Sequence, residues 1–354
     1  MKTKFNYKTL CAIITLLTVC SAMKATTWRV NNTAAYNQST NNQVYSTLTA
    51  AIGSPSVLPG DTLYIESSGT TYGVISLNKK LTLIGTGYYL SNNTGLQNNQ
   101  TSAIIGSLTF AAGSSGSTIM GLNVSGMVGS AVILSNVNLD SITITRCYID
   151  GEIVFQNGSG IVHNKITISK NFVINTTTHP VGTPGTITNL IVTNNRFGGG
   201  IYFQGTNHHG IVANNALGSS VNIQANIAFF NNIITAGTVT QSTNSSTNMY
   251  NNLFSITQPA WLTGGNNNFG VPSGTIYPSV GTPDNLFDPN PIGVCPQCYQ
   301  GLPGGTTEVG MFGGNDPYIL SGIPNIPTIY QLQSSPNAPQ GGTLPSSIST
   351  RSNN

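Results

Sequence analysis

Side chains that could carry acid–base or metal chemistry are scarce in this chain. Its 354 residues include nine Asp and Glu and twelve Lys and Arg. No two carboxylates are adjacent, so the sequence lacks the neighbouring aspartates that would act as acid and base in glycoside hydrolysis. Only one window concentrates charge, and it holds Asp140, Arg146, Asp150, Glu152, His163, Lys165, Lys170 and Arg196.

This charged window has two interpretations. The simpler is a solvated face with weak ion pairs, because surface charges rarely do more. The other is a saccharide groove in which Lys170 or Arg146 receives a proton while Asp150 and Glu152 bind calcium or neutralise a uronate. Calcium is expected only in that second case, and no other cofactor is expected. Arg196 is a further candidate ligand contact.

Aromatic residues and histidines are the other candidates. Trp261 and Tyr72 are candidates for exposed sugar contacts, because an aromatic ring can stack on a sugar ring. His208 and His209 are expected on a loop, and adjacent side chains in extended backbone point apart, which disfavours one shared metal. An internal aromatic column is predicted from Tyr148, Phe172 and Phe197.

The cysteines outside the first 25 residues are Cys147 and the pair in Cys295-Pro-Gln-Cys298. No second Cys or His pair lies near enough in sequence to complete a zinc site, and no βαβ pattern supports a redox motif. A local disulfide or a free thiol pair is therefore expected at Cys295 and Cys298. Cys147 is expected to be a small buried apolar side chain.

An internal repeat occupies the middle of the chain. Its copies align on Cys147, Asn171, Asn195, Asn215, Asn232 and Asn252, at steps of 24, 24, 20, 17 and 20 residues. Each copy reads as strand, turn, strand and loop, without the apolar spacing of a crossover helix.

These repeats predict an all-β fold, a right-handed parallel β-helix. Coils stacked in register form parallel sheets with strands about 4.8 Å apart. Asn at a strand end suits a left-handed turn, and stacked amides can bond along the axis. A leucine-rich repeat is the rival fold. Positions filled mainly by Ile and Val, an irregular period and missing helices argue against it.

The N-terminal segments predict a cap and the first coils. Tyr45 to Ile52 has the spacing of a short amphipathic helix that would lie across the first coil. The turn Pro59-Gly-Asp61 precedes the alternating strand 62–65. With the repeats, about residues 43–256, these segments resemble secreted right-handed β-helix proteins of the pectate-lyase-like superfamily. The resemblance implies the fold but no one activity, because such folds include lyases, hydrolases, epimerases, adhesins and inert scaffolds.

Beyond residue 256 the sequence predicts covers and ends. Gly-, Pro- and Asn-rich segments suggest long loops over the last coil. Residues 310–324 resemble the closing segment of bacterial β-helix proteins without assigned activity. The expected organisation is a signal peptide over 1–25, N-terminal cap and first coils over 26–95, β-helix repeats over 96–256, a loop-rich C-terminal cover over 257–333 and a disordered tail over 334–354.

Residues 1–25 have the features of an export signal. Three lysines precede an apolar run over 10–19, and Ser21 and Ala22 follow it. Lipidation at Cys20 is disfavoured, because Val19 stands where a small residue is expected. Without this segment, eight basic side chains face nine acidic ones, and no apolar stretch of spanning length remains. Neither nucleic-acid binding nor a membrane span is expected.

We therefore expect an exported β-helix scaffold or adhesin, secreted or on the cell surface, that binds an extracellular glycan. The alternative is a polysaccharide lyase or glycoside hydrolase acting in a groove along the helix. The absence of paired carboxylates in the sequence favours binding over catalysis.

Overall fold

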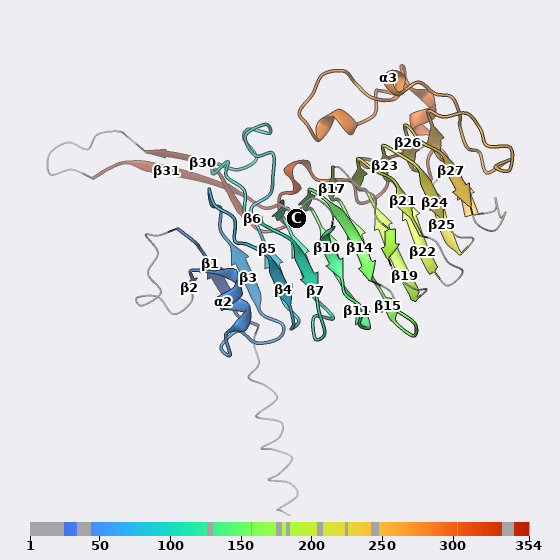
Figure 1. Ribbon diagram of the computed structural model, residues 1–354. Helices are drawn as coiled ribbons and strands as arrows, with labels where there is room; N and C mark the ends of the chain where they lie inside the picture. The colour runs from blue at the N-terminus through green and yellow to red at the C-terminus, as the bar shows by residue number, and fades with distance from the viewer. Residues whose placement is uncertain are drawn as a thin grey trace, which may run out of the picture.

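The computed structural model describes residues 25–33, 44–125, 130–156, 158–174, 179–181, 185–203, 208–223, 226–241, 248–302, 304–334 and 343–353. The predicted signal peptide lies outside the described residues, apart from residue 25. The described chain forms the predicted right-handed parallel β-helix, whose coils are stacked along one axis (Figure 1).

Four parallel sheets make up the sides of the helix. Sheet A has thirteen strands: β1 Thr27–Val30, β2 Val44–Tyr45, β3 Thr62–Ile65, β5 Thr82–Ile84, β8 Thr118–Met120, β11 Leu139–Asp140, β12 Thr143–Thr145, β15 Val162–Asn164, β16 Thr167–Ser169, β19 Thr186–Thr193, β22 His208–Ala213, β25 Ile227–Phe230 and β28 Met249–Tyr250. Sheet B has five: β4 Ile75–Leu77, β7 Leu108–Phe110, β10 Ser130–Leu134, β14 Glu152–Gln156 and β18 His179–Val181.

Sheet C has eight short strands: β6 Ile104–Ile105, β9 Asn123–Val124, β13 Tyr148–Ile149, β17 Phe172–Val173, β20 Arg196–Phe197, β23 Ala216–Leu217, β26 Ile233–Ile234 and β29 Leu253–Phe254. Sheet D has three: β21 Ile201–Tyr202, β24 Val221–Ile223 and β27 Val239–Gln241. In the repeats, a strand of sheet A is followed by a turn, a strand of sheet C and then a strand of sheet B or D.

Alternation of apolar and polar residues places one side chain in two inside the helix. In β3, for example, Leu63 and Ile65 are fully buried while Thr62 and Tyr64 point outward. The strand register continues Leu63 into one interior column: Leu83, Ile119, Ile144, Ile168, Val192, Val212 and Phe229. All are 0% exposed. Burial of each such side chain stabilises the fold by about 1.5–3 kcal/mol.

A ladder of buried asparagine amides runs beside this core, as the repeat alignment predicts. Each Nδ2 donates to the Oδ1 of the next coil, at 2.9–3.1 Å, through Asn171, Asn195, Asn215, Asn232, Asn252 and Asn267. The last step was missed in the sequence, where 264–270 is expected to be loop. Instead Asn268 bridges Leu253 in parallel, because the chain makes one more partial coil.

The left-handed turn belongs to the residue before Cys147 and before each ladder asparagine, including Asn266 before Asn267 with a φ of 53°. From the sequence, one residue is expected to supply both the turn and the amide ladder. This turn column consists of Arg146, Lys170, Asn194, Asn214, Asn231, Asn251 and Asn266, with φ between 53° and 57°. The second residue of each pair supplies the amide ladder.

A short helix caps the N-terminal end of the core, as predicted. Helix α2 covers Leu48–Gly53, and it begins there because the Thr47 hydroxyl accepts a bond from Ala50 N. Leu48, Ala51 and Ile52 are buried against the first coils. Tyr45 lies in β2 instead of the helix.

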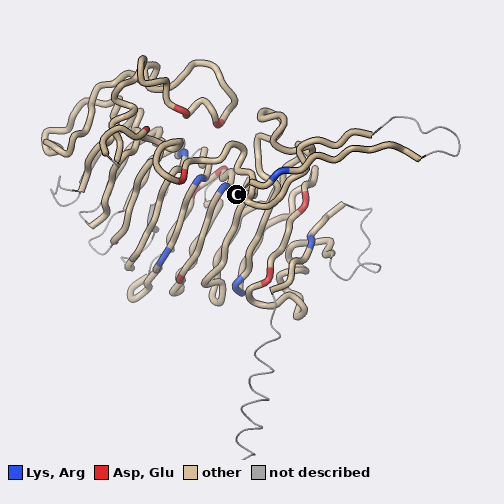
Figure 2. Tube along the Cα trace, turned by 180° about the vertical axis from the view of Figure 1, so that it is seen from behind, with Lys and Arg blue, Asp and Glu red and all other residues tan. Residues whose placement is uncertain are grey.

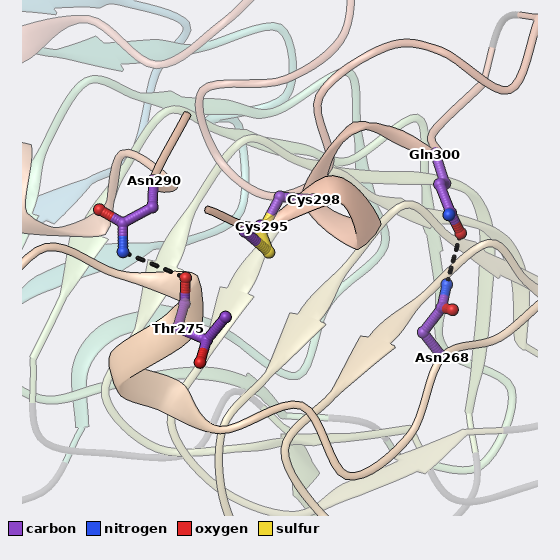
Figure 3. Close-up of a disulfide and its surroundings, with 6 residues drawn as sticks. All are labelled: Asn268, Thr275, Asn290, Cys295, Cys298 and Gln300. Atoms are coloured by element: carbon purple, nitrogen blue, oxygen red, sulfur yellow. Dashed lines mark hydrogen bonds between the residues drawn. A yellow bond between two sulfur atoms is a disulfide. The ribbon is translucent and has the colours of Figure 1, made fainter. Parts of the chain in front are cut away.

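The C-terminal cover packs on the outer face of sheet C. It contains α3 Ser273–Ile276 and the 3₁₀ turns η3 Asn285–Phe287, η4 Pro296–Tyr299 and η5 Leu320–Gly322. Cys295 and Cys298 form a disulfide within it, buried with Ile233 and Leu253 of the coils (Figure 3). Asn268 donates to Gln300 at 3.0 Å, which ties this part of the cover to the last coil.

One buried carboxylate joins the cover to an early coil. Asp284 is 0% exposed and accepts bonds from Asn93 Nδ2 at 2.8 Å, Ser321 N at 2.6 Å and Tyr318 OH at 3.2 Å. Three donors offset the cost of burying its charge. The cover is therefore fixed at both ends of the helix.

Of the predicted disordered tail over 334–354, residues 335–342 and 354 lie outside the described residues, whereas residues 346–351 form a strand. Strands β30 Thr328–Ser334 and β31 Ser346–Arg351 pair antiparallel as a hairpin that projects beyond the coils (Figure 1). Leu332 and Ile348 pair directly across it. Arg351 anchors the hairpin by donating to Leu96 O at 2.7 Å, a long-range contact that composition alone does not reveal.

Candidate functional site

The structure places Arg146 and Lys170 on one corner of the helix, beneath a cover segment. We call residues 310–324 the strap. Arg146 donates to Ile323 O at 2.8 Å, and Lys170 pairs with Asp316. Lys170 is only 6% exposed. Both side chains therefore hold the strap, and they do not line an open groove.

The remaining members of the charged window lie elsewhere. Asp150 follows β13 and Glu152 is the first residue of β14, whereas Arg146 precedes β13 in the turn. Arg196 lies on the outer face of sheet C under the cover, where its guanidinium is 4.2 Å from the Phe287 ring centroid. The charged window is thus not gathered into one groove, and charged residues are scattered along the coils (Figure 2).

The aromatic candidates are also used in packing. Tyr72 is 7% exposed, and its hydroxyl donates to the backbone oxygens of Val30 and Glu66. Trp261 is partly buried against the core. Tyr148 and Phe172 do stack, at 6.3 Å between ring centroids. The next residue of their column is Arg196, because the register turns Phe197 into the core.

The two adjacent histidines begin β22 and do not lie on the expected loop. Their side chains point apart, since His208 is 2% exposed and His209 is exposed. Among the described residues, no three His, Cys, Asp or Glu side chains are placed to hold a metal ion.

A cleft of about 360 Å³ lies where the first coils meet the base of the C-terminal hairpin. We call it the hairpin cleft. The coils contribute a face that contains an aromatic ring and an ion pair, and the chain after β5 contributes amides. Its lining includes Arg29, Tyr64, Glu66, Ser67, Thr86, Gln97, Asn98, Asn99, Pro327, Thr328, Ile329 and Leu332.

Hydrogen bonds fix the polar lining of the hairpin cleft. Glu66 accepts from Arg29 Nε and, at 2.7 Å, from Asn31 Nδ2. Asn99 Nδ2 donates to Ser67 Oγ at 2.6 Å. Burial raises the pKa of the Tyr64 phenol, so the ring stays neutral at physiological pH. The cleft thus presents a neutral ring, amides and one balanced charge pair.

Glu308 is the carboxyl group most suited to acid chemistry among those of the cover. Burial, aided by the nearby Asp288 carboxylate, raises its pKa to about 7. A carboxyl group with such a pKa can donate a proton near neutral pH. No pocket among those described for the structure is lined by Glu308.

Sequence reasoning missed both features. The cleft joins residues 29–99 to residues 327–332, and no local motif signals that meeting. The Gln97-Asn98-Asn99 run was a visible polar signal, but it is common in a chain so rich in Asn. Glu308 is isolated in sequence, and its environment comes from folding.

The fold and the cleft define a right-handed parallel β-helix protein with a ligand-sized recess at one end, lined by both polar and apolar side chains. Comparison with protein-family models, with curated proteins and with solved structures finds no significant match. None of the helices in the described part of the chain is long and apolar enough to cross a membrane.

Proposed function

We propose that this protein is an exported β-helix scaffold or adhesin, of the pectate-lyase-like kind, that binds an extracellular glycan in the hairpin cleft. The observation that carries the proposal is the lining of the cleft. Sugars are bound by side chains that combine a ring face with planar hydrogen-bonding groups, and Tyr64, Gln97 and Asn98 offer these together.

The surroundings of the cleft support binding more than cleavage. Its carboxylate, Glu66, is held by Arg29 and Asn31, so it lacks the free partner that an acid–base pair requires. Arg146 and Lys170, the basic residues that the lyase alternative would use, are held by the strap. Calcium would enter only under the lyase alternative.

Binding is tested with the protein lacking its first 25 residues on a panel of neutral and acidic glycans, followed by calorimetry on any that bind. Tyr64→Ala should abolish binding, because stacking is lost. Tyr250→Ala is the matched control, since Tyr250 lies at the far end of the same outward column and stacks on Phe230. Equal loss in both variants, or no binding by the parent protein, would contradict the proposal.

The alternative function is a polysaccharide lyase or glycoside hydrolase acting in a groove along the helix. Glu308 is the candidate general acid to test for it, although it lines none of the described pockets. Its pKa of about 7 suits a general acid, and Asp288 lies near enough to influence it electrostatically. The test follows reducing ends and ultraviolet absorbance with acidic and neutral polysaccharides, with and without calcium. Turnover that disappears in Glu308→Gln and persists in Tyr64→Ala would favour hydrolysis over the binding function.

A further inference from the structure

An unbroken rank of threonines runs along the outer face of sheet A. The register pairs each threonine with the next across successive neighbouring strands: Thr27, Thr62, Thr82, Thr118, Thr143 and Thr167. We call these six residues the threonine rank. At a strand spacing of about 4.8 Å the rank spans roughly 24 Å. Ile191, Ile211 and Ala228 continue the column.

The hydroxyls of the threonine rank are left available for an external partner. Within the described residues, none of the six side chains takes part in a hydrogen bond, whereas Ser169 in the neighbouring column donates to Thr145 at 3.1 Å. The rank is outward-facing, with Thr27 exposed and the other five half-buried. No charged residue interrupts the column from Thr27 to Ala228.

The strand register of sheet A keeps the spacing between the threonines of the rank regular. The column shows no register shift, although the coils vary in length. Side-chain ladders and stacking favour sheets with little twist, and successive strands of sheet A lie nearly parallel (Figure 1). The hydroxyls are therefore held at a fixed spacing instead of following a strongly twisted surface.

We propose that the threonine rank binds ice. Each hydroxyl donates one hydrogen bond and accepts two, so waters that bridge neighbouring threonines repeat at the strand spacing. That spacing is close to the repeat of equivalent oxygens in an ice surface. The adjacent methyl groups favour an ordered water layer over mobile solvent, because they offer no competing polar partner.

A soluble glycan fits this surface less well. The six threonines themselves offer no ring platform, no bidentate amide and no charge, the groups that give discrete ligands their orientation. Arg29 and Tyr64 of the hairpin cleft lie in the neighbouring outward column, beside Thr27 and Thr62 only. Its chemistry is uniform and periodic, which suits a periodic partner. The inference is independent of the hairpin cleft.

The test measures inhibition of ice recrystallisation and the fraction of protein incorporated into slowly growing ice. Thr143→Lys places a long charged side chain in the middle of the rank and should abolish both. Thr240→Lys, on the exposed face of sheet D, is the control and should retain both. Matching thermal melts of the two variants exclude unfolding as the cause.

Three outcomes would overturn the proposal: a parent protein that is excluded from ice, equal loss in Thr143→Lys and Thr240→Lys, or a Thr143→Lys variant that keeps its ice activity and loses glycan binding. The last result would assign the rank to a glycan. Tyr64→Ala should keep full ice activity, so failure of cleft binding and failure of ice binding are distinguishable.

Discussion

At the scale of single residues, Asn215 is one of the ladder asparagines whose side chain makes many buried hydrogen bonds. Its Nδ2 donates to Val192 O, Ala213 O and Asn232 Oδ1, each at 2.9 Å, and its Oδ1 accepts from Asn195. Asn215→Ala should lower the free energy of unfolding by at least about 2 kcal/mol, because several buried groups lose their partners. Urea denaturation measures the change. Asn92→Ala, at an exposed site, should stay within about 0.5 kcal/mol of the parent, and a similar loss there would contradict the ladder's importance.

His163 should make the fold sensitive to acid. It is 0% exposed in the core, and burial lowers its pKa to about 4 from 6.5. Because the unfolded chain takes up this proton first, the contribution of neutral His163 is present above pH 6.5 and is lost as the pH falls towards 4. Relative to His163→Leu, the parent should lose about 2–3 kcal/mol over that interval, measured by denaturation at several pH values. Parallel pH curves for the parent and His163→Leu would contradict this.

Glu308 should lower the stability of the fold as the pH rises, which is the opposite of the trend expected for His163. Its folded pKa of about 7 exceeds the ordinary 4.5, so the folded state disfavours its ionised form. The stability cost appears as the pH rises from 4.5 through 7. Glu308→Gln should therefore be more stable than the parent at pH 8, by about 1 kcal/mol after allowance for partial solvent screening, and equal to it at pH 4. Thermal melts at both pH values check this, and a less stable variant at pH 8 would refute it.

At the scale of elements, the strap depends on the turn column. Asn194 Nδ2 donates to Met311 O at 3.0 Å and to Gly313 O at 2.7 Å. Asn194→Gly keeps the left-handed turn and removes both bonds, so hydrogen exchange should accelerate over residues 310–324 while the coils stay protected. Asn251→Gly is the control, because Asn251 has the same turn geometry and no such strap contact. Acceleration in both variants would show that the turn, not the strap contact, is responsible.

The coils could be predicted from sequence because each depends on a local pattern. Apolar alternation sets the inward face of β3, and the Asn spacing sets the ladder. The sequence predicts the cover as a loop-rich segment, but its contacts could not be predicted, because they are long-range. In the sequence Lys170 has no visible partner. The fold brings Asp316, 146 residues away, next to it. The strand register likewise pairs Phe172 with Arg196 and not with Phe197, so Arg196 continues the outward-facing column. A shift of one residue would have placed Phe197 there.

At the scale of the whole molecule, a parallel β-helix must protect the open edge of its terminal coils. Leu48 of α2 is 0% exposed against the first coils. Leu48→Lys should detach the helix and cause concentration-dependent association, measured by light scattering, because unpaired strand edges recruit other chains. Thr49→Lys, on the exposed side of α2, should remain as dispersed as the parent. A monomeric Leu48→Lys protein would show that another segment provides the protection.

The contacts of Asp284, Ser321 and Arg351 have a consequence for the timing of folding. They join residues made late in synthesis to Asn93, Tyr88 and Leu96, which are made early. Successive coils can form one after another during synthesis, but these junctions can form only after residues 284–351 have been made. A partly synthesised chain can therefore form the coils without these contacts, and residues 284–351 complete the structure when they are added.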